Sequence, residues 1–248
     1  MPNTSQFVEC KDCSLDPICH PAFSTDSAFG NTSFNYVLDN MQRRKTIPAS
    51  APAYQQNEPV KAIYAVTSGA FKLLSTDKQG HQQLVGFRFP GELLGDEALA
   101  IPSHPVTALA LTDASICVIP LEVIQDISRT IPAFQQAFLT LIIQQCYLAH
   151  QQLSDYVALK SADQKLAAFL MHLLKRNTRL NNDPETLQLP MSRTDIASYL
   201  GLRHETLSRT LGKFQQHGLI LLKGKKITLL HRANLESLAS GNESFSLN

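Results

Sequence analysis

The chain has 248 residues, of which 44% are hydrophobic and 17% charged, so it has the composition of an ordinary soluble globular protein with a core of good size. No apolar run approaches the roughly 18 residues that a membrane span needs, and residues 1–20 do not resemble a signal peptide; we therefore expect a cytoplasmic protein with no membrane association. The net charge of +1 hides an asymmetry: residues 191–232 carry eight Lys/Arg against two acidic residues, which favours a polyanionic partner for that segment.

Residues 1–22 form a cysteine-rich segment. Cys10, Cys13 and Cys19 make a C-x2-C-x5-C run, and Cys117 lies far downstream. Thiols stay reduced in the cytosol, so the four cysteines are predicted to be metal ligands rather than disulfide partners. Four thiolates suit a tetrahedral zinc or an iron–sulfur cluster. A site closed by one remote ligand forms only when the tail folds back onto a distant domain, which is an arrangement suited to a sensor.

Two alternatives for the cysteines stay open at this point. His20 follows Cys19 directly and would complete a Cys3His zinc site, although adjacent side chains seldom converge on one ion. A thiol-redox enzyme would use Cys10 and Cys13, but the βαβ context of such a motif is missing.

Residues 23–131 are predicted to form a β-roll. One short helix is expected at Phe34–Arg44, and short apolar runs between Gly and Pro turns then indicate closely spaced strands. The expected strands are Ala62–Thr67, Ala70–Ser75, Gln83–Phe89, Leu94–Ile101, Thr107–Leu111 and Ser115–Ile119. Asp96 and Glu97 are expected to be turn and surface groups, and His104 to be structural or exposed.

Residues 132–160 are predicted to form one long helix that pairs with a second copy of the chain. Its apolar residues are spaced alternately by three and four, as in a heptad seam. The predicted dimer interface comprises Leu139, Ile142, Cys146, Ala149, Leu153 and Tyr156. Cys146 is interpreted as a buried, inert thiol within that seam. The alternative is a helix that packs only on its own β-roll.

Residues 161–236 are predicted to form a winged helix-turn-helix, with residues 237–248 as a C-terminal tail. A first helix, Ser161–Leu174, begins at a serine N-cap. Ser192 and Asp195 then favour a capping box, Gly201 favours a helix stop, and a second helix follows at about Glu205–His217. Its inward residues are expected to be Leu207, Leu211 and Phe214, and its exposed face to carry Glu205, Ser208, Arg209, Thr210 and Lys213.

The exposed face of that second helix carries groups that read base edges. Arg209 can donate two hydrogen bonds to guanine, and Glu205 can accept one from an amino group of cytosine or adenine. A hairpin at Leu219–Leu230 with a cationic tip suits phosphate contact. The predicted contacts to double-stranded DNA are Arg193, Arg203, Glu205, Thr206, Ser208, Arg209, Lys213 and Lys225. The alternative is a surface helix with ordinary solvated charges.

Almost the whole chain resembles the CRP/FNR superfamily of bacterial transcription regulators, and within it the oxygen-responsive FNR branch. The resemblance is carried by Arg193–Leu202, by Glu205–Leu211 with its E-x-x-S-R pattern, and by the four cysteines. It implies an α+β fold: an N-terminal β-roll of the cyclic-nucleotide-binding jelly-roll type, a long dimerisation helix and a C-terminal winged helix-turn-helix.

The resemblance also implies a mechanism. Cys10, Cys13, Cys19 and Cys117 match the branch's [4Fe–4S] ligands, and loss of the cluster in oxygen would weaken a homodimer that binds an inverted repeat such as TTGAT…ATCAA. RNA polymerase would be contacted near Thr76–Gly80. A zinc-bound or metal-free tail that responds to another signal is the alternative.

Two classes of activity are not expected. After Gly91-Glu92-Leu93, the stretch His104–Ala108 lacks the arginine that clamps a cyclic phosphate, so we expect no cyclic nucleotide. No nucleophile motif, phosphate-binding glycine loop or convergent acid/base set is present in the sequence, so we do not expect an enzyme.

Overall fold

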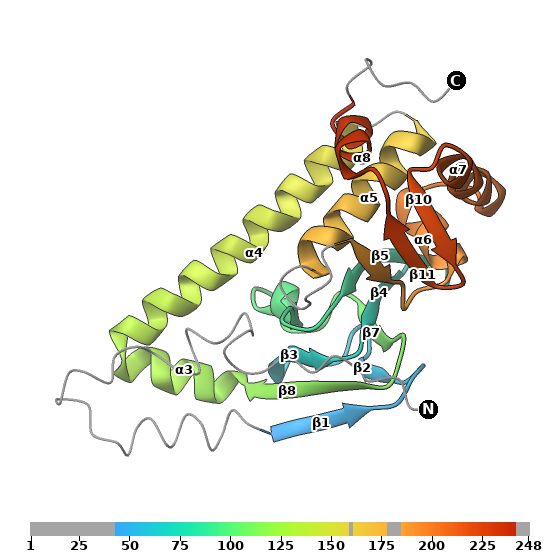
Figure 1. The fold of residues 1–248 in the computed structure, drawn as a ribbon. Helices are drawn as coiled ribbons and strands as arrows, with labels where there is room; N and C mark the ends of the chain where they lie inside the picture. The colour runs from blue at the N-terminus through green and yellow to red at the C-terminus, as the bar shows by residue number, and fades with distance from the viewer. Residues whose placement is uncertain (1–42, 159–160, 178–184, 242–248) are drawn as a thin grey trace. The chain divides into compact units, whose positions relative to one another are not determined.

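The computed structural model describes residues 43–158, 161–177 and 185–241 (Figure 1). The chain divides into two compact units, residues 1–146 and residues 147–248. One long helix, α4 (Pro132–Ala158), begins in the first unit and ends in the second. No helix in the described ranges has the length and apolar character needed to cross a lipid bilayer.

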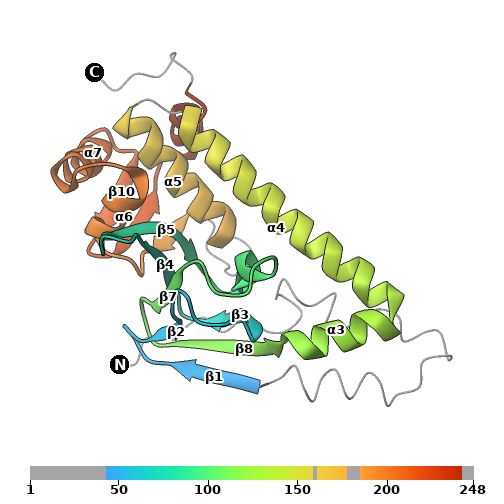
Figure 2. The ribbon, with the colours of Figure 1, turned by 180° about the vertical axis from the view of Figure 1, so that it is seen from behind.

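The first unit is built on two antiparallel four-stranded sheets (Figures 1 and 2). Their strand orders are β1-β8-β3-β6 and β2-β7-β4-β5. The strands are β1 (Arg43–Ile47), β2 (Pro52–Tyr54), β3 (Ala62–Ser68), β4 (Phe71–Thr76), β5 (Gln82–Arg88), β6 (Leu93–Leu94), β7 (Thr107–Ala110) and β8 (Ala114–Pro120). The predicted β-roll is therefore confirmed.

The sheet that contains β3 and β8 buries both of its faces. Val66 and Ile116 pack against the other sheet, in a core that includes Phe71 and Leu73 of β4. The opposite face packs against helices α3 (Leu121–Thr130) and α4, in a second core of Ile63, Ala65, Leu93, Ile119, Val123, Ile124, Ile127, Phe134 and Leu141. Because both faces are covered, β3 is almost continuously apolar rather than alternating.

Three expectations for this unit need correction. The predicted strand Leu94–Ile101 is wrong beyond Leu94, because Gly95 takes a left-handed conformation with φ of 81° and the chain enters a 3-10 helix, η3 (Asp96–Ala98). Of the predicted helix Phe34–Arg44, residues 34–42 lie outside the described residues, whereas Arg43 and Arg44 belong to strand β1. Helix α3 was not expected, since it follows β8 at Pro120 with no intervening turn residues.

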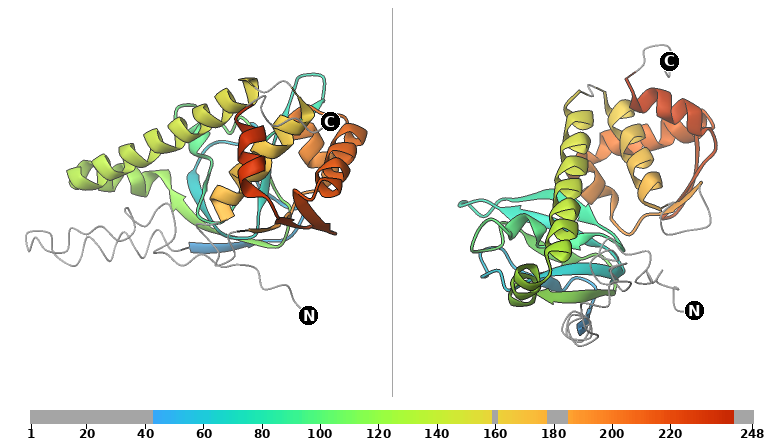
Figure 3. Two further views of the ribbon diagram at one scale, coloured as in Figure 1. Left: turned by 45° about the horizontal axis from the view of Figure 1, so that its top comes forward. Right: turned by 90° about the vertical axis from the view of Figure 1, so that its left-hand side faces the viewer.

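The second unit contains the rest of α4 and a winged helix-turn-helix. Its further elements are α5 (Ala162–Asn177), β9 (Thr186–Gln188), α6 (Arg193–Leu200), α7 (His204–Gln216), β10 (Ile220–Lys223), β11 (Lys226–Leu229) and α8 (Arg232–Ala239). The strands form a sheet in the order β10-β11-β9, and α5 lies beside α8 (Figure 3). Helix α8 was not predicted, and it carries regular structure past the expected boundary at residue 236.

Candidate nucleic-acid interface and cysteine ligands

Helix α6 begins at the predicted capping box of Ser192 and ends at the predicted glycine, Gly201. The Ser192 Oγ accepts a hydrogen bond from the Asp195 N–H at 3.0 Å, and the Ser192 N–H donates to the Asp195 Oδ2 at 3.1 Å, which forms a capping box. At the other end Gly201 takes the left-handed conformation, with φ of 63°. This glycine sets the turn that leads into α7.

Helix α7 has one buried face and one open face. Leu207, Thr210, Leu211 and Phe214 are buried at the i, i+3, i+4, i+7 spacing of a core-facing stripe. Thr210 was expected on the exposed face, and this is wrong, since it is only 5% exposed.

The open face of α7 carries the side chains predicted to read bases. Glu205 and Arg209 are exposed and lie one helical turn apart, while Thr206 and Ser208 are half-buried beside them. Gly212 continues this face by a further turn, and nothing lies within 4 Å of where its Cβ would be. Arg203 and Arg193, which precede α7 and begin α6, are also exposed. The surface thus presents donors and an acceptor without bulky obstruction.

The wing is a two-residue hairpin with an exposed cationic tip. Lys223 of β10 pairs with Lys226 of β11, and Gly224 has the positive φ, 61°, that the first central position of a type II′ turn requires. Lys225 is exposed, and its Nζ donates to the Pro190 carbonyl at 3.4 Å. Three lysines within four residues form a surface suited to phosphate contact.

Lys213 differs from the other predicted DNA contacts. Its Nζ lies 2.9 Å from the Asp163 Oδ2 of α5, and its side chain is 34% exposed. The ammonium group is therefore engaged inside the domain rather than extended from the open face of α7.

Three of the four predicted cluster ligands, Cys10, Cys13 and Cys19, lie outside the described residues. Cys117 lies on β8, half-buried, opposite Arg44 of β1 and Ala65 of β3. Its side chain packs against the apolar core that β3 and β8 share with α3 and α4. Across residues 43–158, 161–177 and 185–241, no three or more His, Cys, Asp or Glu side chains gather as a metal site would need.

Helix α4 packs on its own unit along one side and is uncovered along another. Phe134 and Leu141 are buried in the core with α3, and Ile142 is partly buried against it. Leu139, Cys146 and Ala149 of the predicted seam are exposed in the single chain. Helix α4 also contains Leu153 and Tyr156. The packing of α4 on its own unit is therefore confirmed for this side, with Ile142 at its edge, whereas the dimer seam stays a prediction.

A cluster of charged side chains inside the β-roll was missed by the sequence analysis. Asp96 and Glu97 of η3 each have a carboxylate oxygen that is buried without a hydrogen-bond partner among the described residues. Burial raises the pKa of Asp96 to about 7, against the lowering effect of the nearby Arg88 guanidinium. The Arg88 Nε donates to the Leu93 carbonyl at 3.0 Å. The expectation that the acidic pair lies on the surface is wrong.

The aromatic rings of Tyr54 and His104 lie beside these charged side chains of the β-roll. The Tyr54 hydroxyl lies 3.1 Å from the Glu97 Oε1, and burial raises the pKa of that phenol. The His104 ring stacks on Tyr54 with centroids 3.8 Å apart, and burial lowers its pKa. His104 is buried, in agreement with the structural role expected for it.

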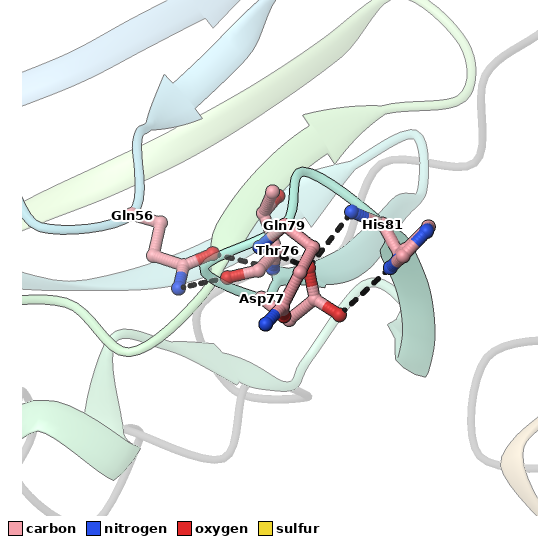
Figure 4. A network of polar contacts seen from close by, with 5 residues as sticks. All are labelled: Gln56, Thr76, Asp77, Gln79 and His81. Atoms are coloured by element: carbon pink, nitrogen blue, oxygen red, sulfur yellow. Dashed lines mark hydrogen bonds and ion pairs between the residues drawn. The ribbon is translucent and has the colours of Figure 1, made fainter.

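The hairpin between β4 and β5, which the family resemblance links to RNA polymerase, is held by a polar network (Figure 4). The Gln56 amide exchanges two hydrogen bonds with the Thr76 backbone, at 3.0 and 2.7 Å. The Asp77 Oδ1 accepts from the Gln79 and His81 N–H groups at 2.8 and 2.9 Å, and its Oδ2 lies 3.0 Å from the His81 Nδ1. The His81 contact lowers the pKa of Asp77.

Comparison with known proteins places both units in a family. Residues 44–130 match the cyclic nucleotide-binding domain, and residues 164–238 match the Crp-like helix-turn-helix domain. The chain is 33% identical over 233 residues to the fumarate and nitrate reduction regulatory protein of Vibrio cholerae serotype O1, which covers 94% of this chain and 90% of that protein. The protein of the same name from Escherichia coli K12 gives the same identity and coverage.

Solved structures show the same fold. FixK2 from Bradyrhizobium japonicum matches with a TM-score of 0.70 and 26% identity, over 79% of this chain and 96% of that one. A transcriptional regulator of the crp/fnr family from Eubacterium rectale matches with a TM-score of 0.63 and 21% identity, over 89% of this chain and 98% of that one.

Proposed function

Because the chain belongs to the CRP/FNR family of DNA-binding transcription regulators, we propose that it is an oxygen-responsive homodimeric regulator. Cys10, Cys13, Cys19 and Cys117 would hold a [4Fe–4S] cluster, which supplies oxygen-sensitive redox chemistry when it is bound. The curated relatives are regulators rather than enzymes, and this supports a binding function.

One observation carries the proposal: the remote ligand and the dimerisation helix share a core. Cys117 and Ile142 pack against the same buried group of side chains, which includes Ile119 and Leu141. Any change in how tightly the thiol of Cys117 is held therefore acts on the packing of α4. A coupling of about 3 kcal/mol changes a dimerisation constant by over a hundredfold.

The environment of Cys117 also fits an iron–sulfur ligand. Cys117 pairs with Ala65 of strand β3, and the core beside it is mostly aliphatic. Water therefore has little access to the sulfur from the side covered by α3 and α4. Solvent exposure and hydrogen bonding to the ligand sulfurs set the reactivity of such sites. In the described residues, strand β1 begins at Arg43, and the next residue, Arg44, pairs with Cys117, so the part of the chain that follows the N-terminal cysteines lies beside this proposed ligand.

DNA reading is assigned to the open face of α7. Glu205, Ser208 and Arg209 would read the half-site, and the lysines of the wing would contact phosphates. Dimerisation matters because one helix-turn-helix makes too few contacts for specific binding at cellular salt. Two α7 helices one DNA turn apart would select an inverted repeat, of which TTGAT…ATCAA is the proposed form.

We propose that no cyclic nucleotide binds the β-roll. Arg88 is hydrogen-bonded to the carbonyls of Leu93 and Phe87. Burial lowers the pKa of its guanidinium, but the nearby carboxyl groups of Asp96, Glu92 and Glu97 outweigh this effect and raise it. A cyclic phosphate would meet two acidic groups and no uncommitted guanidinium in this cluster. For RNA polymerase, the ordered hairpin at Thr76–Gly80 offers a preformed contact surface.

The test is the metal content and oligomeric state of protein purified without oxygen. We expect about four iron and four sulfide per chain, and a visible absorption band that bleaches in air as dimer converts to monomer. Cys117→Ser should abolish the band and the dimer, whereas Cys146→Ser, a thiol outside the proposed ligand set, should keep the band. Zinc or no metal, with a dimer indifferent to air, would leave a DNA-binding regulator and remove oxygen sensing.

A further inference from the structure

The first turn of α5 has a well-defined backbone. The Ser161 Oγ accepts a hydrogen bond from the Gln164 N–H at 3.1 Å, and the Ser161 N–H donates to the Gln164 Oε1, also at 3.1 Å. This reciprocal pair is a capping box, which satisfies two of the N–H groups left open at a helix start. Side chains that leave this turn therefore start from a fixed position.

Two charged side chains of this turn reach the two helices of the helix-turn-helix. Asp163 pairs with Lys213 of α7 at 2.9 Å. The Lys165 Nζ donates to the carbonyl of Leu200, the last residue of α6, at 3.3 Å. A cation at a helix C-terminus complements the partial negative charge there. One turn of α5 thus contacts the end of α6 and the side of α7.

The pair between Asp163 and Lys213 differs from a surface ion pair. The two side chains are only 25% and 34% exposed, so much of the interaction is shielded from water. Three of the four buried residues of α7 are apolar, among them Leu207 and Phe214. Apolar packing is non-directional, whereas a charge-assisted hydrogen bond fixes a distance and a direction. The pair therefore adds a contact of fixed direction to the mainly apolar packing of α7.

We propose that Asp163 is a positioning residue for DNA reading, which holds α7 through Lys213 at the angle needed for base contact. Lys213 then acts inside the protein and is not a phosphate contact. Asp163 lies five residues after Ala158, the end of α4, so the pair connects the reading helix to the segment that directly follows the predicted dimerisation helix. This inference rests on the proposed reading role of α7.

The experiment compares specific and non-specific DNA binding of full-length anaerobic protein. A duplex enriched from a random pool by the wild-type chain serves as specific DNA, and a scrambled duplex serves as the reference. For Asp163→Asn we expect specific binding to weaken by about fivefold. Non-specific binding should stay equal or tighten, because the variant is more positively charged. For Lys213→Gln we expect a similar specific loss and an unchanged slope of log Kd against log salt concentration.

A charge swap separates positioning from a merely structural role. Asp163→Lys combined with Lys213→Asp keeps the total charge and should restore most of the specific affinity. The melting temperature and dimer mass of every variant are measured alongside, and we expect dimer mass to stay constant.

The opposite pattern would overturn the inference. If Lys213→Gln lowers the salt slope by about 0.9 per subunit, and Asp163→Asn tightens specific and non-specific binding alike, then Lys213 contacts phosphate. An affinity for specific DNA that is the same in Asp163→Asn as in the wild type would overturn the inference as well. A wild-type chain that enriches no sequence would instead refute the reading role of α7 itself.

Discussion

Replacing Leu139 by alanine tests the proposed dimer interface, and its effect can be worked from the exposure of that side chain. Leu139 is 58% exposed in the single chain. Full burial of a leucine side chain is worth about 1.5–3 kcal/mol, so covering the exposed part in a dimer contributes about 1–2 kcal/mol per subunit. Because a two-fold interface counts the change twice, Leu139→Ala should cost about 2–4 kcal/mol. The dimerisation constant should therefore fall by about 30- to 900-fold.

The assay is sedimentation equilibrium of anaerobic protein over a range of concentrations. Leu148→Ala is the matched control, because Leu148 is also exposed in the single chain (43%) and lies nine residues along α4, on the opposite side of the helix. Both changes exchange leucine for another strong helix former, so the helix itself is little affected. An equal loss of dimer in the two variants, or no loss with Leu139→Ala, would refute the proposed seam.

Three further predictions concern the β-roll and the DNA-binding unit. Asp96→Asn should flatten the pH dependence of β-roll stability. Because the pKa of this carboxyl is raised to about 7, the free energy of unfolding of the wild type falls as pH rises from about 4 to 7, by on the order of 4 kcal/mol. Denaturant unfolding at several pH values measures this, and an identical profile in the variant would contradict it. Ser192→Ala should destabilise the second unit by about 1 kcal/mol, because the capping box of α6 is lost. Ser198→Ala, on the exposed face of the same helix, should be neutral. Thermal unfolding compares the two variants, and an equal loss of stability in both would count against the cap. Arg209→Ala should cost about 1–3 kcal/mol of specific binding and relax preference at one base pair, as read by competition among half-site variants; a uniform loss across all of them would assign Arg209 to phosphate instead.

The helix-turn-helix was predictable almost to the residue because its signals are local. Ser192 and Asp195 mark the start of α6, Gly201 marks its end, and the apolar stripe of α7 follows within a few residues. Chemistry that lies within one turn of chain can be read from the sequence without knowing the fold.

Features that depend on distant residues were not predictable in this way. The sequence predicts that Lys213 is a surface cation, because its partner Asp163 lies fifty residues upstream and only the fold brings the two side chains together. From the sequence, Asp96 and Glu97 have the pattern of turn residues, whereas in the fold Arg88 lies near Asp96 and the Tyr54 hydroxyl contacts Glu97. Strand β1 reads Arg-Arg-Lys-Thr-Ile and shows no apolar alternation; within the described residues it is an edge strand, whose Ile47 lies in the core.

The pairing of Arg44 with Cys117 has a consequence for how the N-terminal segment can vary. If all four cysteines bind one cluster, residues 20–42 join a ligand, Cys19, to a strand that already lies beside another ligand. Those residues then form a closed loop, and doubling the length of such a loop costs only about 0.6 kcal/mol of closure entropy. Strand β1 has no such tolerance, because a shift of one residue would turn Ile47 out of the core. Insertions between Cys19 and Arg43 should therefore leave the proposed cluster site intact, whereas an insertion within β1 should abolish it.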